Sequence, residues 1–203
     1  MPVLSCSIMT HGKLKNMKFV LCSSIQELSI FAGAWLYAAH FFIYQGKMML
    51  NIYTVSFFGH RIIEHGLETE RRLDDLIRGF IREKEYVDFL VGRNGEFDQL
   101  VSSAVRRAKK SIDDANSSLI LVLPYMTAEY SNNKASFEDY YDEVEVCGSS
   151  HYKSAFQERN RAMIDRSDFV VFCIDHDSGG AYQTARYTKK IDKPFINIGS
   201  YQI

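Results

Sequence analysis

The sequence predicts an α/β fold, a Rossmann-like open parallel sheet of about five strands with helices on both faces. Two observations favour it. From residue 50 onwards, short apolar runs alternate with longer segments in which apolar residues recur at helical spacing. Each short run is apolar at nearly every position, which is typical of parallel strands buried on both faces. With the strands numbered along the chain, the natural expectation is the order 3-2-1-4-5.

The first strand is predicted at 51–58, where aromatic and β-branched residues precede Gly59. The following segment, about 67–84, is predicted to be an amphipathic helix, because its apolar residues lie three or four positions apart between charged ones. A second short strand, 87–92, ends in a glycine. Together these segments predict the first strand–helix–strand unit of a parallel sheet.

The next predicted helix carries apolar residues from Phe97 to Ala108 and has a basic group towards its end. Cations suit the negative end of the helix dipole, so we expect a solvated helix end rather than a binding patch. The basic residues are Arg106, Arg107, Lys109 and Lys110. The third strand is predicted at 118–125.

A long polar stretch, 126–150, follows the third strand, with acidic residues interleaved with tyrosines. A connection of this length inside a compact domain is usually functional or mobile. The same periodicity arguments then predict a helix at 153–166, a strand at 168–174, a helix at 180–190 and a last strand at 193–199.

The composition is that of an ordinary globular protein, with 46% apolar and 24% charged residues among 203. The formal net charge of −1 does not indicate a polyanionic partner, so a nucleic-acid role would need a local basic patch. The four cysteines show no C-x-x-C pair and no metal-ligand spacing, and we expect neither a metal nor a cofactor. Cys173 lies in an apolar run and is predicted to be a buried thiol, which fits a cytoplasmic protein.

Residues 1–48 differ from the domain predicted at 49–203, since they hold few acids and an apolar run at 29–44. Lysines precede this run, as in a signal peptide or anchor, but it is shorter than the ~20 residues of a spanning helix. It could instead be a helix packed on the domain or on a partner. The interpretation we favour is that the natural start is Met48 or Met49, directly before the first predicted strand.

Glycines and polar residues follow three of the predicted strands. Ligands of an open parallel sheet bind beyond the carboxyl ends of the strands, near the point where the strand order reverses, here between the first and fourth strands. Glycines let the backbone approach a ligand, and free amides at a helix start favour an anion. The candidate ligand-binding residues are Gly59, His60, Arg61, Gly92, Asn94, Gly95, Asp98, Arg159, Asn160, Ser178, Gly179, Gly180 and Gln183.

Several of these residues also have simpler interpretations. His60 could cap a turn, whereas the adjacent Arg61 favours an anion contact. Asp98 lies just inside a helix start, where it could interact with the helix dipole or accept ribose hydroxyls. Arg159 and Arg161 cannot share one helix face, so we expect at most one of them to point at a ligand.

Four motifs resemble the SLOG superfamily of Rossmann-like nucleotide-binding domains, above all its small stand-alone YpsA-like bacterial members. They are FFGHR (57–61), VGRNGEFD (91–98), RNRAMIDRSD (159–168) and SGGA (178–181), and the likeness covers about residues 50–200. The superfamily includes the LOG, or "lysine decarboxylase-like", phosphoribohydrolases and the DNA-processing protein DprA. The resemblance implies a nucleotide-derived ligand with its phosphate at the turn 179–180 and its base and ribose at the other two strand ends.

The sequence departs from the LOG signature P-G-G-x-G-T-x-x-E. With the glycine pair aligned, Ser178 replaces the proline, Gln183 the threonine and Arg186 the glutamate that serves hydrolysis. An arginine cannot activate water or stabilise an oxocarbenium-like centre as a carboxylate does. We therefore do not expect the LOG reaction.

The main functional expectation is a protein that binds or senses a nucleotide or a nucleotide-derived ligand without a known reaction. The alternative is a hydrolase of the N-glycosidic bond of a nucleotide. A weaker alternative is binding of single-stranded DNA, as in DprA, which the lack of net positive charge disfavours. The expected partners are thus a small molecule and, by analogy alone, a second copy of the chain, but neither nucleic acid nor a membrane.

Overall fold

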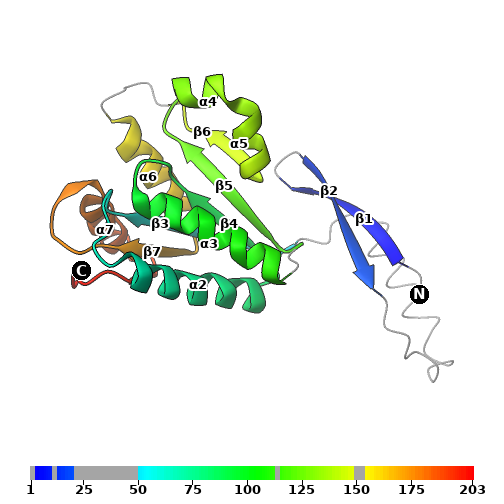
Figure 1. Ribbon diagram of the computed structural model, residues 1–203, viewed down its shortest axis with the longest axis horizontal. Helices are drawn as coiled ribbons and strands as arrows, with labels where there is room; N and C mark the ends of the chain where they lie inside the picture. The colour runs from blue at the N-terminus through cyan, green and yellow to red at the C-terminus, as the bar shows by residue number, and fades with distance from the viewer. Residues whose placement is uncertain (1–2, 11–12, 21–49, 113–114, 149–153) are drawn as a thin grey trace. The chain divides into compact units, whose positions relative to one another are not determined.

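The computed structural model describes residues 3–10, 13–20, 50–112, 115–148 and 154–203. The chain divides into two compact units, Met1–Leu50 and Asn51–Ile203. In the first unit, β1 (Val3–Thr10) pairs with β2 (Lys13–Val20) in an antiparallel ladder (Figure 1). The apolar run at 29–44 lies outside the described residues. Among the helices that are described, none has both the length and the apolar character to cross a membrane.

The second unit contains a six-stranded sheet in which every neighbouring pair is parallel. Its strands are β3 (Ile52–Gly59), β4 (Tyr86–Val91), β5 (Ser117–Leu123), β6 (Glu143–Val146), β7 (Phe169–Cys173) and β8 (Phe195–Asn197). They lie in the order β6-β5-β4-β3-β7-β8. The predicted order 3-2-1-4-5 is therefore confirmed for β5-β4-β3-β7-β8, and β6 is an additional edge strand.

Helices cover both faces of this sheet, as predicted (Figure 1). They are α2 (Gly66–Glu83), α3 (Glu96–Ile112), α4 (Ala128–Asn132), α5 (Lys134–Tyr140), α6 (Ala155–Arg166) and α7 (Gly179–Lys190). α2 and α3 lie on one face, and α6 and α7 lie on the other. The reversal of strand order between β3 and β7 is thus also the place where the chain changes from one face to the other.

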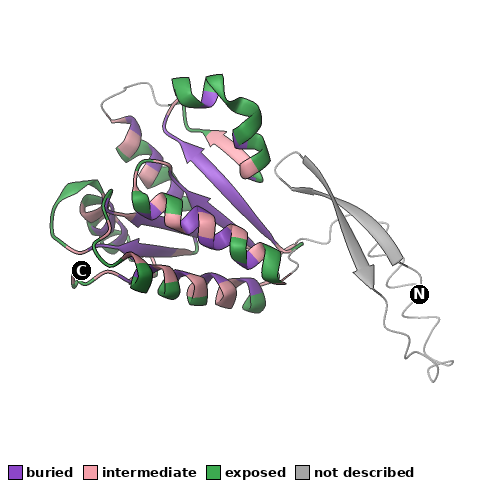
Figure 2. Ribbon diagram, in the orientation of Figure 1, coloured by how far each residue is buried: buried purple, intermediate pink, exposed green. Residues whose placement is uncertain are grey.

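Successive strand side chains point to opposite faces, so the sheet separates two hydrophobic clusters. Phe57 belongs to the cluster under α2 and α3, whereas its neighbour Phe58 belongs to the cluster under α6 and α7. Figure 2 shows the consequence: β4 and β5 are buried throughout, β7 is buried over most of its length and β3 over half of its length, and the long helices are buried only along stripes. Cys173 is 1% exposed, so the predicted buried thiol is confirmed.

The stretch 126–150 is not the structureless connection that its polarity indicated, because α4, α5 and β6 lie within it. Thr127 caps α4 by accepting a hydrogen bond from the Tyr130 amide at 3.1 Å. The rings of Tyr130, Phe137 and Tyr141 are buried in the cluster under α2 and α3. The tyrosines among the acids thus supply the apolar side of two short helices, and β6 pairs with β5 beyond them.

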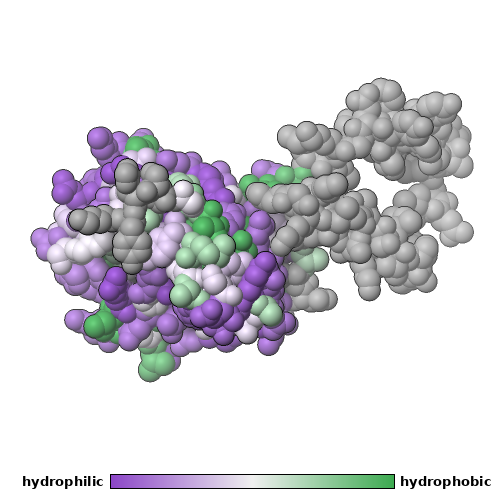
Figure 3. All heavy atoms as spheres, turned by 90° about the horizontal axis from the view of Figure 1, so that it is seen from above, coloured by the Kyte–Doolittle hydropathy of each residue, from purple (hydrophilic) through white to green (hydrophobic). Residues whose placement is uncertain are grey.

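The basic end of α3 is used in contacts with neighbouring elements. Arg107 pairs with Glu70 and Asp74 of α2 at 2.8 and 3.1 Å, and Lys109 pairs with Asp142 at 2.7 Å. The Arg106 guanidinium lies over a tyrosine ring. The end of α3 is therefore not the solvated helix end that we expected, because three of its four cations contact neighbouring side chains. On the face that Figure 3 shows, the described surface is mostly hydrophilic with small scattered hydrophobic areas.

Candidate functional site

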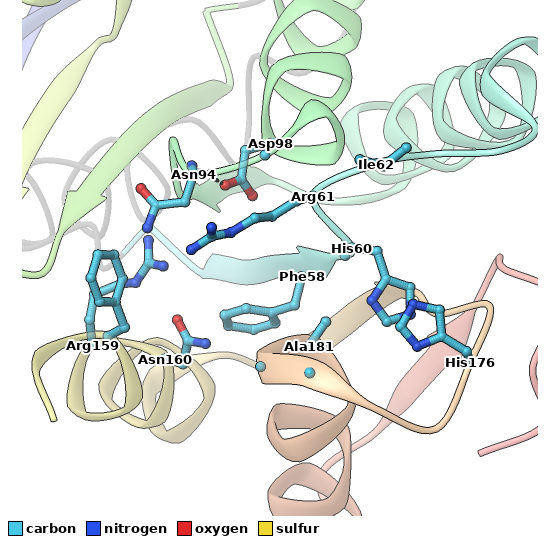
Figure 4. A pocket seen from close by; sticks show the side chains of 15 residues that line it. Phe58, His60, Arg61, Ile62, Asn94, Asp98, Arg159, Asn160, His176 and Ala181 are labelled. Atoms are coloured by element: carbon cyan, nitrogen blue, oxygen red, sulfur yellow. Dashed lines mark hydrogen bonds between the residues drawn. The ribbon is translucent and has the colours of Figure 1, made fainter. Parts of the chain in front are cut away.

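A cavity of about 530 Å³ lies at the carboxyl edge of the sheet, where the loops after β3, β4 and β7 meet the first turns of α6 and α7 (Figure 4). This is the place where the strand order reverses, as expected for a ligand site in this architecture. The cavity is lined by Phe58, Gly59, His60, Arg61, Ile62, Asn94, Gly95, Asp98, Phe156, Arg159, Asn160, His176, Gly179, Gly180 and Ala181.

The structure brings together all but three of the candidate residues. Gly92 lies beneath the cavity, Ser178 precedes the first residue of α7, and Gln183 lines a smaller neighbouring cavity. The lining residues that the sequence did not single out are Phe58, Ile62, Phe156, His176 and Ala181. The aromatic ones resemble core residues in sequence. His176 could have been singled out from the sequence, because it is a polar residue within the DHDSGG turn.

The N-terminus of α7 presents backbone amides to the cavity. Gly179 has a φ of +84°, a left-handed conformation that favours glycine, and the Ser178 side chain does not cap the helix. A Cβ added to Gly180 would meet no heavy atom within 4 Å, so this turn borders open space. The first amides of a helix have no intrahelical acceptor, and the helix dipole adds positive potential. The turn is therefore suited to a phosphate oxygen.

Arg61 supplies a cation on the side of the cavity opposite the N-terminus of α7. Its exposed side chain extends across the cavity, between Asn94 and Asp98 on one side and Phe58 on the other (Figure 4). Its carbonyl accepts a hydrogen bond from the Glu96 amide at 2.9 Å, which fixes the backbone below the side chain. None of the ion pairs in the described part of the chain involves Arg61. Its charge is thus free to meet an anion.

Arg159 and Asp98 line the cavity and are themselves buried. The Arg159 side chain is 6% exposed in the folded chain, and its Nη1 donates to the Val122 carbonyl at 3.0 Å. Burial lowers the pKa of Arg159 and raises that of Asp98, while the attraction between their charges opposes both shifts. Asp98 Oδ2 accepts a hydrogen bond from the Asn94 amide at 2.7 Å, so this carboxylate stabilises the loop after β4.

Gly92 makes room for these two charged groups. A Cβ at this position would lie 2.6 Å from Arg159 Nη1 and 2.9 Å from Asp98 Oδ2. Position 92 therefore requires glycine because a side chain would collide with these two groups. Arg161, by contrast, is exposed, with its guanidinium 5.3 Å from the centre of the Tyr187 ring. Of the two arginines of α6, Arg159 lines this cavity and Arg161 does not.

Two histidines stack beside the glycine turn that begins α7. The rings of His60 and His176 lie 3.7 Å apart at an angle of 15°, and His176 Nδ1 is 3.0 Å from Ser178 Oγ. His60 is 9% exposed. Burial lowers its pKa, the neighbouring His176 lowers it further, and Asp175 opposes this change.

Three residues that line the cavity each hold a buried polar atom without a hydrogen-bond partner in the described structure: His60 Nε2, Arg159 Nε and Asn160 Oδ1. An unsatisfied buried polar atom costs about 1–3 kcal/mol, so three of them around one cavity indicate a polar ligand site.

The hydrogen bonds of Thr184 determine the orientation of the Asn160 amide. Thr184 Oγ1 donates its one proton to the Gly180 carbonyl at 2.7 Å, so it can only accept from Asn160 Nδ2 at 3.0 Å. An inverted amide would place two acceptors face to face. Asn160 Oδ1 is therefore fixed as an acceptor, and it has no partner among the described residues.

The arrangement is one for binding. Arg61 and the α7 amides can hold an anion, Phe58 and Phe156 add apolar side chains to the lining, and Asn160 Oδ1 has no partner in the described structure. Arg186, at the position of the LOG glutamate, is exposed and is not among the lining residues. Among the described residues, no group of three histidine, cysteine or acidic side chains is arranged to hold a metal ion.

No family model matches the sequence, and no curated protein matches it either. Among solved structures, the chain is similar to DNA processing protein A from Helicobacter pylori, described with a single-stranded DNA binding mode, with a TM-score of 0.52 and 18% identity. It is also similar to DNA processing protein A (DprA) from Streptococcus pneumoniae, with a TM-score of 0.54 and 16% identity. The matches cover 73% and 75% of this chain but only 66% and 52% of those chains. At this identity, the likeness establishes the fold.

These neighbours correct three expectations from the sequence. The assignment to the YpsA-like and LOG groups is wrong on this comparison, because both structures are DNA processing proteins. The main expectation, binding or sensing of a small nucleotide-derived ligand, is contradicted in favour of the weaker DNA-binding alternative. The expected absence of a nucleic-acid partner is contradicted too, since the Helicobacter pylori protein has a single-stranded DNA binding mode.

Proposed function

We propose that the chain binds single-stranded DNA through the cavity at the carboxyl edge of its sheet. A phosphate of the strand lies between Arg61 and the first amides of α7, and an unpaired base lies against Phe58 and Phe156. Proteins that bind single strands combine these two features, a cationic track for the backbone and aromatic faces for the bases. The fold likeness to DNA processing protein A supports the same ligand class.

The observation that carries the proposal is that the fixed acceptor Asn160 Oδ1 lies in the same cavity as the donors that Arg61 and the α7 amides offer to an anion. A phosphate diester has only acceptor oxygens, and deoxyribose within a strand has no hydroxyl group. In DNA, the bases alone carry N–H donors. Base pairing hides the Watson–Crick donors inside a duplex, whereas an unpaired strand can offer them to Asn160 and its phosphate to Arg61.

The overall charge of −1 does not oppose this function. Phosphate binding depends on cations that are free at the site, and several arginines elsewhere are already paired with carboxylates, such as Arg93 with Glu129 and Arg166 with Glu145. Arg61 has no such partner in the described chain, so its local field is not cancelled. The average over the chain therefore conceals a positive site.

Fluorescence anisotropy with a labelled thymidine oligonucleotide tests the proposal. We expect binding that weakens with salt, preference over duplex DNA, and a loss of roughly tenfold in Arg61→Gln, as expected for a charged contact to one phosphate. Arg82→Gln is the matched control. Arg82 is an exposed arginine in the last turn of α2, and this helix runs from the carboxyl edge of the sheet back to the opposite edge.

A second variant, Gly180→Val, tests the position of the ligand without changing a charge. The new side chain would enter open space, so we expect an unchanged melting temperature and weaker binding. Equal affinity of the wild type and both site variants, or equal losses in the Arg82→Gln control, would contradict the proposed site.

A further inference from the structure

A second, smaller cavity adjoins the proposed DNA site. Its volume is about 290 Å³, and it lies in the groove between α6 and α7. It shares Arg61, Phe156, Asn160 and Gly180 with the larger cavity, so the two are separated only by these shared side chains. The remaining wall consists of Gln157, Arg161, Ile164, Gln183, Thr184 and Tyr187.

The spacing of these residues shows how the groove is built. On α6 they recur at 156, 160 and 164, and on α7 at 180, 184 and 187, the spacing of one helix face. Both helices begin at the carboxyl edge of the sheet and run back along it. The groove therefore starts at the proposed phosphate turn and leads away from it between the two helices.

The charged residues that line the groove favour an anion. Two arginines line it, Arg61 and Arg161, and none of its described lining residues is a carboxylate. Arg161 is exposed and enters no ion pair among the described residues. The Tyr187 ring below it is held in place, because its hydroxyl donates to Asp165 at 2.7 Å. An arginine stacked on a fixed aromatic ring presents its N–H groups outward at low entropic cost.

We propose that this groove is a subsite for the next nucleotide of the bound strand, with its phosphate at Arg161 and its base or sugar towards Tyr187. The inference rests on the proposed function. It also gives a direction to the strand, which passes over the wall formed by Arg61 and Phe156 and continues along α6. Gln183, which bonds to Gln157 across the groove at 3.4 Å, would then contact this second nucleotide rather than the first.

Salt-dependent binding of a labelled thymidine oligonucleotide to the full chain tests the subsite. We expect Arg161→Gln to bind several-fold more weakly and to reduce the slope of log K against log salt by about 0.7, the change for one phosphate on a single strand. Arg82→Gln, exposed on α2 and outside both cavities, should leave affinity and slope unchanged. A second variant, Gln183→Glu, places a negative charge in the groove and should weaken binding without altering the melting temperature.

The outcomes separate the two proposals. If the wild type does not bind the oligonucleotide, both the proposed function and the subsite are wrong. If the wild type binds and Arg61→Gln weakens it, but Arg161→Gln and Gln183→Glu bind as the wild type does, the function stands and the subsite is wrong. Losses in Arg161→Gln and Gln183→Glu with the expected slope support the subsite. Should Arg161→Gln fail to fold, Gln183→Glu decides alone.

Discussion

The polar atoms of the cavity occupy fixed positions because each residue uses its other polar atoms within the protein. Asn160 donates to Thr184, and Arg159 donates to the Val122 carbonyl. In each case one further atom is left without a partner at the cavity. A site organised in this way loses little entropy when its ligand binds, since its side chains are already ordered.

Because His60 titrates, we predict that a fall in pH strengthens DNA binding but lowers the stability of the fold. Burial and the neighbouring His176 lower the pKa of His60 in the free protein, and its Nε2 has no partner among the described residues. A nearby phosphate favours the protonated ring, so we expect DNA affinity to rise as pH falls from about 8 to about 6. The unfolded chain binds this proton more readily than the unliganded fold, so stability should fall as pH decreases through about 6.5.

Anisotropy and urea unfolding over the same pH range measure the two trends. Asn at position 60 keeps a polar side chain but does not titrate, so His60→Asn should flatten the pH dependence of affinity and reduce that of stability. The charged and titratable neighbours His176, Asp175 and Arg61 are unchanged in this variant. An identical pH profile in His60→Asn and the wild type would exclude His60 as the titrating group.

At the scale of elements, the long helices and the central strands follow from the apolar pattern. β3, β4, β7, α2 and α6 begin and end within two residues of their predicted limits, since each buries a regular face. α4, α5 and β6 escaped prediction because they have only five, seven and four residues, too few to show a period. Their formation depends on packing of aromatic rings against a core that the local sequence does not reveal.

We predict that a substitution of Gly79, in α2, stabilises the domain. Gly79 lies in the interior of this helix, and a Cβ there would meet no heavy atom within 4 Å. Alanine loses less backbone entropy on folding, so Gly79→Ala should stabilise the domain by about 0.5–1 kcal/mol. Gly66→Ala is the matched control, because Gly66 also has open space but is the first residue of the helix, and its effect should be smaller. Urea midpoints measure both, and destabilisation by Gly79→Ala would refute the argument.

At the scale of the whole molecule, topology brings together residues that are far apart in sequence. The glycine turns after β3, β4 and β7 could be predicted to converge, because parallel strands end at one edge of the sheet. Phe58 and Phe156 could not be identified as cavity residues, since an aromatic residue in a strand or amphipathic helix has the same pattern whether it faces a cavity or the core. Under the proposed function, the net charge is a poor guide for a similar reason, because it averages paired and unpaired cations over the chain.

Because Cys173 lies inside the sheet, we predict that its alkylation reports directly on the global stability of the domain. The residue lies in β7, between two neighbouring strands of the sheet, and burial raises its pKa to about 11. At about pH 8 roughly one thiol in a thousand would be ionised even with access, so alkylation should require unfolding of the sheet. The exposed Cys147 is the internal control and should react in the folded protein. Peptide mass spectrometry after iodoacetamide treatment in increasing urea distinguishes the cysteines. We expect Cys173 labelling to follow the main unfolding transition, and labelling well below that transition would show that β7 opens independently of the domain.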